Sequence, residues 1–233
     1  MSFSASIFIP QEPKGFNLTR SGKLCWYSLG ALLIYSLPVL FIENYYDCRF
    51  PQWVNYPFFL IFLVNFSSYF VQLTEFENLN GIFDGLISFE EDFLMLNETK
   101  YKYSELENLV IYGNCFYGEK TKNYRYGPMF GNGVENLISF THNGFKIEKY
   151  FQLNSERHLD ELQETLIHII TLEKIPYKRE YLNFINKEYR SFILFELFIG
   201  KLIKEKRIEY SDGIRLIGFN LKQAEEFKNK ILS

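Results

Sequence analysis

LCWYSLGALLIYSLPVLFI, residues 24–42, and YPFFLIFLVNFSSYFVQL, residues 56–73, are the two stretches that decide the fold of this chain. Neither contains a charged residue, and the uncharged region around the second covers residues 50–74. A helix of about 20 apolar residues crosses the hydrocarbon core of a bilayer. We therefore expect a transmembrane helical hairpin over residues 24–74, with helices at about 24–42 and 54–74.

Two other interpretations of these stretches compete with a membrane hairpin. The first is a pair of buried core helices, and the second is a cleaved signal peptide at the first stretch. Trp26 and Trp53 lie near the ends of the runs, where amphipathic rings prefer the membrane interface. The first run also lacks a small-residue cleavage site and is followed at once by the second. These features favour two real spans.

The second span carries a few polar residues, of which Asn65, Ser68 and Gln72 are candidate functional residues. A polar group in the middle of a membrane needs a hydrogen-bond partner. The favoured partner is the first helix or a neighbouring subunit, because polar contacts between helices are the commoner use. A pore or ligand contact is the alternative.

Basic residues near the spans predict the orientation of the chain. Lys14, Arg20 and Lys23 precede the first span, whereas the connecting loop carries only Arg49. Positive residues stay on the cytoplasmic side. We expect residues 1–23 to form a flexible cytoplasmic tail or a short stretch lying on the membrane. Two spans return the C-terminal part to the same side.

Residues 81–174 show the alternation and turn signals of an antiparallel sheet. Strands are expected at residues 82–89, 93–97 and 106–117, the last with a bulge at Gly113. Asn143-Gly144 lies between two alternating runs and predicts a type I′ hairpin turn. This turn pairs His142 with Phe145, Thr141 with Lys146, Phe140 with Ile147, and Ser139 with Glu148. An amphipathic helix is expected to follow, capped at residues 154–155 and running to about residue 173.

The last part, residues 178–233, predicts a helix, a β-hairpin and a second helix. Residues 189–205 are strongly apolar but interrupted by charges, so they predict a helix that does not span a membrane. Ser211-Asp212-Gly213 predicts a turn within a hairpin at residues 207–219. The basic residues of this part are interpreted as a solvated surface, which is favoured over a nucleic-acid contact. They are Lys201, Lys204, Lys206, Arg207 and Arg215.

Residues 81–174 together resemble the bacterial pleckstrin-homology-like (PH-like) domain. The resemblance lies in the strand, acidic turn and strand of GLISFEEDFLML, the Tyr-Ser-Glu-Leu step, the Asn-Gly turn and the single C-terminal helix. It implies a seven-stranded antiparallel barrel plugged by that helix. It also implies a location in the bacterial inner membrane, because many such proteins carry two spans before the domain. The fold class is therefore expected to be α+β.

Two loops carry further candidates. Residues 118–133 are rich in Gly and are read as a mobile loop, whose Tyr124, Arg125 and Tyr126 are candidate interaction residues. The turn Glu90-Glu91-Asp92 is acidic and would repel phosphate, which argues against phosphoinositide binding. An exposed turn is favoured there over a cation site.

The sequence contains no motif for a catalytic site, a metal or a cofactor. It lacks a P-loop, a dinucleotide fingerprint and zinc-ligand spacing. The net charge of −3 predicts no broad attraction to nucleic acid. Three separated cysteines, Cys25, Cys48 and Cys115, fit a reducing compartment.

These observations lead to two hypotheses of function. The favoured one is a membrane-tethered, non-enzymatic module that binds a protein partner or copies of itself. The alternative is a pore-forming effector of a bacterial defence system, triggered by a ligand or partner. An enzyme acting at the membrane is a distant third, and no small-molecule ligand is identified.

Overall fold

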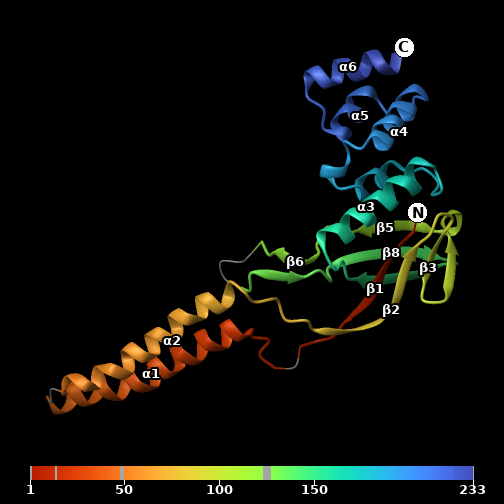
Figure 1. Ribbon diagram of the computed structural model, residues 1–233. Helices are drawn as coiled ribbons and strands as arrows, with labels where there is room; N and C mark the ends of the chain where they lie inside the picture. Colours follow the sequence, from red (N-terminus) through yellow and green to blue (C-terminus); the bar gives the residue numbers. More distant parts are fainter. Residues whose placement is uncertain (1, 14, 48–49, 123–126, 233) are drawn as a thin grey trace. The chain divides into compact units, whose positions relative to one another are not determined.

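The computed structural model describes residues 2–13, 15–47, 50–122 and 127–232, and its fold class is α+β (Figure 1). The chain separates into two compact units. The hairpin unit holds residues 11–81 and 117–132. The sheet unit holds residues 2–10, 82–116 and 133–232. Cys48 and Arg49, predicted to lie in the loop between the spans, are outside the described residues.

The hairpin unit is built on two long helices that lie side by side (Figure 1). Helix α1 spans Arg20–Tyr46 and contains Pro38, and α2 spans Tyr56–Gln72. A short 3-10 helix, η1 (Gln52–Asn55), precedes α2. The Thr19 side chain caps α1 by accepting a hydrogen bond from the Gly22 N–H. The predicted helical hairpin is thus confirmed, with α1 longer at both ends than expected.

A small two-stranded sheet completes the hairpin unit. It pairs β6 (Tyr117–Lys120) with β7 (Phe130–Asn132). The segment after α2 joins it: the Glu77 N–H donates to the Phe130 carbonyl at 2.8 Å, and the Phe76 ring stacks on Tyr117 at 4.6 Å. Reading residues 118–133 as one mobile loop was wrong at β6 and β7, because these strands pair with each other and are contacted by residues 75–77.

The sheet unit contains a seven-stranded sheet in the order β4-β3-β2-β1-β9-β8-β5. The pairs β2·β3, β3·β4, β1·β9, β8·β9 and β5·β8 are antiparallel. The strands are β1 (Phe3–Pro10), β2 (Gly81–Phe89), β3 (Phe93–Leu96), β4 (Thr99–Lys102), β5 (Glu107–Tyr112), β8 (Asn136–His142) and β9 (Phe145–Phe151).

Strand β1 corrects the prediction of a flexible N-terminal tail. It lies between β2 and β9, with Ile7 opposite Phe151. Its Phe3, Ala5 and Ile7 are buried, whereas Ser4 is exposed. This alternation is weak in sequence because Ala and Ser carry little hydrophobic signal. The helical hairpin is therefore an insertion between two neighbouring strands, and the sheet unit begins at β1 rather than at residue 81.

The hydrophobic core lies between the sheet and α3 (Glu156–Thr171). Phe89, Phe140 and Phe151 from the strands are fully buried, as are Leu162 and Leu166 from α3. Ser155 caps α3 by accepting from the His158 N–H, as predicted. The expected barrel is not closed in the described residues, because β4 and β5 are the two edges of the sheet.

The Asn-Gly turn and its register are confirmed. Asn143 and Gly144 both have positive φ, of 51° and 80°, as a type I′ turn requires. All four predicted cross-strand pairs between β8 and β9 are present. The predicted bulge at Gly113 is wrong: the irregularity in β5 lies between Glu107 and Val110.

The C-terminal part is entirely helical and belongs to the sheet unit. After η3 (Arg179–Phe184) and η4 (Lys187–Tyr189) come α4 (Ile193–Lys204), α5 (Tyr210–Ile217) and α6 (Leu221–Leu232). The predicted β-hairpin at residues 207–219 is wrong. Gly213 lies inside α5, where an added Cβ would come within 2.7 Å of Ile203, so it permits close helix packing instead of a turn.

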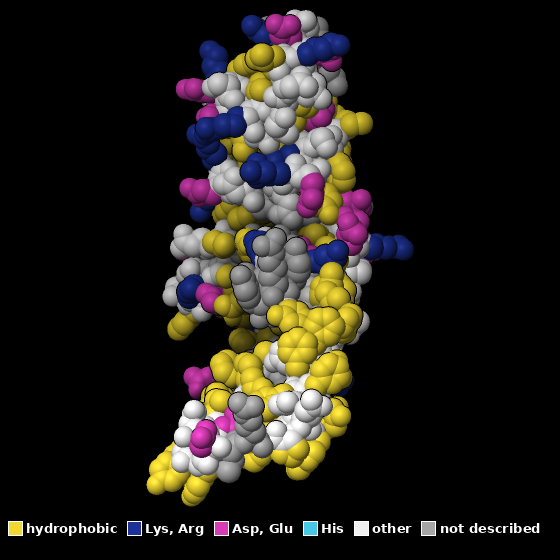
Figure 2. All heavy atoms as spheres, turned by 90° about the vertical axis from the view of Figure 1, so that its left-hand side faces the viewer, with side chains coloured by type: hydrophobic (Ala, Val, Ile, Leu, Met, Phe, Trp, Pro, Cys, Tyr) yellow, Lys and Arg dark blue, Asp and Glu magenta, His cyan; other side chains and the backbone are white. Residues whose placement is uncertain are grey.

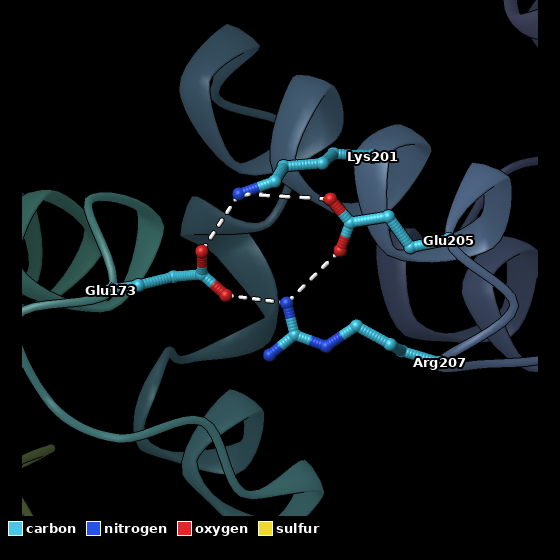
Figure 3. A network of polar contacts seen from close by, with 4 residues as sticks. All are labelled: Glu173, Lys201, Glu205 and Arg207. Carbon is cyan, nitrogen blue, oxygen red and sulfur yellow. Dashed lines mark hydrogen bonds and ion pairs between the residues drawn. The ribbon is translucent and has the colours of Figure 1, made fainter.

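An ion-pair network joins the end of α3 to the end of α4 (Figure 3). The Glu173 carboxylate accepts from Lys201 at 2.7 Å and also from Arg207. Glu205 contacts the same two cations from the other side. Hydrogen bonds from Lys201 and Arg207 hold the pKa of Glu173 below its usual value. The network thus fastens the C-terminal helices to α3.

Candidate functional site

The outer surface of the helix pair is the largest apolar feature of the hairpin unit. Figure 2 shows hydrophobic side chains gathered over the two helices at the bottom of the view. Both helices, the second taken together with η1, are long and apolar enough to cross a membrane. In the most apolar part of each, only 6% and 11%, respectively, is buried. Core helices of a soluble protein would hide most of such a surface. Exposed members include Leu33, Ile34, Leu37, Phe41, Phe59, Phe62, Phe66 and Phe70.

Polar groups lie between the two helices and bond to one another. The Asn65 amide of α2 donates to the Ser28 hydroxyl of α1 at 2.8 Å. Ser28 in turn donates to the Cys25 carbonyl, and Ser68 donates to the Asn65 carbonyl at 2.6 Å. Ser28 and Ser68 are buried, and such small residues let helix backbones approach closely. Asn65 and Ser68 therefore belong to one polar seam, defined as Ser28, Asn65 and Ser68.

Tyr35 of α1 joins this helix to η1, just before α2. Its hydroxyl donates to the Val54 carbonyl at 2.9 Å, and its ring meets Phe58 edge-on at 5.0 Å. This carbonyl belongs to η1, where the backbone is not satisfied by a regular α-helix. A tyrosine that combines an apolar body with a polar tip suits this position.

The start of α1 is fastened by Glu75, three residues after the end of α2, whose role the sequence patterns did not predict. Its carboxylate accepts from the backbone N–H groups of Arg20 and Ser21 and from the Ser21 hydroxyl. Burial alone raises the pKa of this carboxyl, but hydrogen bonds from Ser21, Thr19 and Arg20 together hold it below the usual value. A carboxylate is favourable here because the first turn of a helix carries partial positive charge.

Gln72 lies apart from the polar seam, at the end of α2. Its side-chain amide donates to the Gly127 carbonyl, and its own carbonyl accepts from the Met129 N–H at 3.2 Å. Gln72 thus joins α2 to the segment that leads into β7. Tyr124, Arg125 and Tyr126, the other predicted interaction residues, lie outside the described residues.

The acidic turn of the sheet unit forms ion pairs with a lysine side chain of the same chain. Lys174, just after α3, contacts Asp92 at 2.8 Å and Glu91 at 3.1 Å. These contacts raise the pKa of Lys174, and the hydrogen bond to Asp92 is the largest cause. The turn therefore helps to hold the end of α3 against the sheet.

The described residues contain no group of three His, Cys, Asp or Glu that could hold a metal ion. Two of the histidines make structural contacts. His158 has one ring nitrogen 2.8 Å from the Ser4 carbonyl, and the other accepts from the Asn154 N–H. His142 packs edge-on against the Tyr101 ring and lies 3.7 Å from Glu105.

Comparisons with protein-family models, curated proteins and solved structures found no match. The geometry of the two units is therefore the basis for a functional interpretation.

Proposed function

We propose that this chain is a membrane-tethered module that binds a protein partner or a second copy of itself, without catalytic activity. The supporting observation is the helix pair: its outer surface is apolar, whereas Ser28, Asn65 and Ser68 bond inside it. In lipid, a hairpin must satisfy its polar groups internally. The helix pair would sit in the inner membrane of a bacterium, with both termini in the cytoplasm, as the basic residues before α1 favour.

We further propose that the sheet unit is a PH-like domain with an unusual insertion. Seven strands and one helix after the last strand support this proposal, although in the described residues the sheet is open between β4 and β5 where the resemblance implies a closed barrel. The proposed domain takes its first strand from β1, before the helical hairpin. This arrangement attaches the domain to the membrane helices through two chain connections instead of one.

The pore-forming alternative receives less support from the geometry. A pore needs polar side chains that face a water-filled channel. Asn65 and Ser68 are instead engaged at the contact between α1 and α2. We therefore retain the tethered interaction module as the single proposal.

The experiment that tests this proposal starts with the full chain in its own membranes. Extraction at alkaline pH should leave it in the membrane pellet. Mild detergent should then release a species whose mass indicates either a defined homo-oligomer or a complex with an identified protein. A chain that washes off the membrane would overturn the tether. A strict monomer that captures no protein would overturn the interaction role.

A further inference from the structure

A row of large apolar side chains crosses one face of the sheet at one end. The edge row, as we name it, consists of Tyr112, Leu137, Tyr150, Phe8 and Phe83, one residue from each of five neighbouring strands. Tyr112 is opposite Leu137, Leu137 is opposite Tyr150, and Tyr150 is opposite Phe8. The Phe8 and Phe83 rings are 5.5 Å apart. Strands lie about 4.8 Å apart, so the row is roughly 20 Å wide.

The edge row lies on the face opposite the hydrophobic core. Successive residues of a strand point to opposite faces. Ile111, Ile138, Phe151 and Ile7, each next in sequence to a member of the row, belong to the buried core. Four members of the row are accessible: Tyr112 is 52% and Phe83 43% exposed, and Leu137 and Tyr150 are half-buried. Phe8, in the middle of the row, is buried. The edge row is therefore not part of the hydrophobic core.

The edge row is also at the end of the sheet where the chain leaves for the helix pair. β1 ends at Pro10, two residues after Phe8, and β2 begins at Gly81, two residues before Phe83. Residues 11–19 join β1 to α1, and residues 73–80 join α2 to β2, so the connectors are nine and eight residues long. A fully extended connector of that length spans at most about 30 Å. Both tethers thus hold this end of the sheet near the bilayer.

We propose that the edge row rests in the headgroup region of the bilayer that holds the helix pair. This inference depends on the proposed membrane tether. The partner is the lipid interface, because the amphipathic rings of Tyr112 and Tyr150 prefer that zone, with Phe83 and Leu137 adding apolar area beside them. The Tyr112 hydroxyl accepts a hydrogen bond from Asn114, which keeps a polar group at the tip of this ring.

Acidic residues beside the edge row limit how deeply it can enter the lipid. Asp84 follows Phe83 and is exposed, and Glu135 lies two residues before Leu137. A carboxylate in hydrocarbon is costly, whereas the headgroup region is hydrated. The row therefore makes a shallow contact and does not insert.

Quenching by brominated lipid tests this contact in the full chain. The chain is reconstituted in phosphatidylcholine vesicles whose lipids carry bromine close to the headgroup. Tyr150→Trp is made in a Trp26→Phe, Trp53→Phe background, so that one tryptophan reports. Phe145→Trp in the same background is the matched control, because Phe145 is 76% exposed and lies at the other end of β9. The two positions are about 17 Å apart along the strand.

The expected result is quenching of the Tyr150→Trp variant several-fold stronger than that of the Phe145→Trp variant. Equal quenching of the two, or none at Tyr150→Trp, overturns the inference. Tyr112→Trp, at an exposed position, replaces Tyr150→Trp if that variant loses the circular dichroism of the parent chain. The unmodified chain separates the two proposals: quenching of Trp26 and Trp53 supports the tether by itself, and its absence would overturn the tether as well.

Discussion

At the scale of single residues, the helix pair depends on a few polar contacts set in an apolar surface. Asn65 reaches Ser28 across the pair, and Glu75 binds the first turn of α1. Each contact joins α1 to α2, or to the segment just after it, and each satisfies polar groups that lipid could not satisfy in the proposed membrane location. Their loss should therefore weaken the hairpin itself.

The first prediction concerns Asn65→Leu. It should destabilise the helix pair by about 1 kcal/mol, the usual size of a hydrogen bond between membrane helices. The measurement is thermal unfolding of the full chain in detergent, followed by the fluorescence of Trp26 and Trp53. Ser67→Leu is the control, because exposed Ser67 bonds only to the Val64 carbonyl of its own helix. If both variants unfold alike, Asn65 does not hold the pair together.

The second prediction concerns the pH dependence contributed by Glu75. The pKa of Glu75 in the folded chain lies below the ordinary value of 4.5. Its contribution is therefore present above about pH 4.5 and is lost as the pH falls through the lower, folded pKa. Glu75→Gln should cost about 1–2 kcal/mol at neutral pH, as expected for a charge-assisted cap.

Unfolding of both proteins in detergent at pH 7 and at progressively lower pH measures this effect. The difference in stability between the parent chain and Glu75→Gln should shrink with acidification. A difference that stays constant with pH would show that the carboxylate charge plays no part.

Residue patterns predicted some of these contacts better than others. Asn65 stood out in sequence because it is a polar residue in an apolar run. A bond to the first helix or to a neighbouring subunit was the favoured interpretation, and the structure shows the bond to the first helix. Glu75 was missed because its partners, Arg20 and Ser21, are more than fifty residues away. A Ser or Thr at the start of a helix predicts a cap from the same segment, but it does not predict a carboxylate supplied by a segment distant in the sequence.

At the scale of secondary-structure elements, α4 shows how packing and charge share the work of attaching the C-terminal helices. Its Phe195 and Leu202 are fully buried, and the Glu173 network closes over its end. Partly exposed ion pairs contribute little individually. Burial of apolar side chains is therefore expected to dominate the attachment.

The third prediction compares two leucines of α4. Leu202→Ala, at a position with no exposure, should lower stability by about 2–5 kcal/mol. Leu197→Ala, at a position 53% exposed on the same helix, should change it by less than about 0.5 kcal/mol. Chemical denaturation of the full chain, with proteolysis of residues 178–233 as a second readout, measures both. Comparable losses would mean that α4 is buried differently.

Element type was predictable where local signals and tertiary contacts agree. The Asn-Gly turn succeeded because it sits between two alternating strands that also bury a common face. Ser211-Asp212-Gly213 failed because the same kind of signal lies in a segment with helical spacing. There, Gly213 is needed for its small size against Ile199 and Ile203. A single sequence does not distinguish a glycine used for a turn from one used for close packing.

At the scale of the whole molecule, the sheet contains a strand that the chain makes long before its neighbours. β1 lies between β2 and β9, although the helical hairpin follows it directly. Sequence patterns located the hairpin and most strands of the sheet, but not this connection. Pairing across such a distance leaves no local signal, and Ser and Ala at alternate positions make β1 look like a polar tail.

The fourth prediction is that β1 is essential for the sheet. Ile7→Asp, at a buried position opposite Phe151, should abolish cooperative unfolding of the sheet unit, because an unpaired charge would enter the core. Ser4→Asp, at an exposed position on the same strand, should change stability by less than about 0.5 kcal/mol. Circular dichroism and hydrogen exchange of the full chain measure both. A folded Ile7→Asp variant would show that β1 is not needed for the sheet to fold.

The central position of β1 has a consequence for how this protein is made. The ribosome releases β1 first, but its partner β9 follows roughly 140 residues later, about 10–30 s at ordinary rates of translation. In the proposed membrane tether, the helical hairpin would emerge and insert into the lipid during that interval. β1 would remain unpaired with β9, beside the membrane, until β9 is synthesised. Completion of the sheet is thereby a late event, and a nascent chain whose hairpin fails to insert would hold its central strand open to proteases.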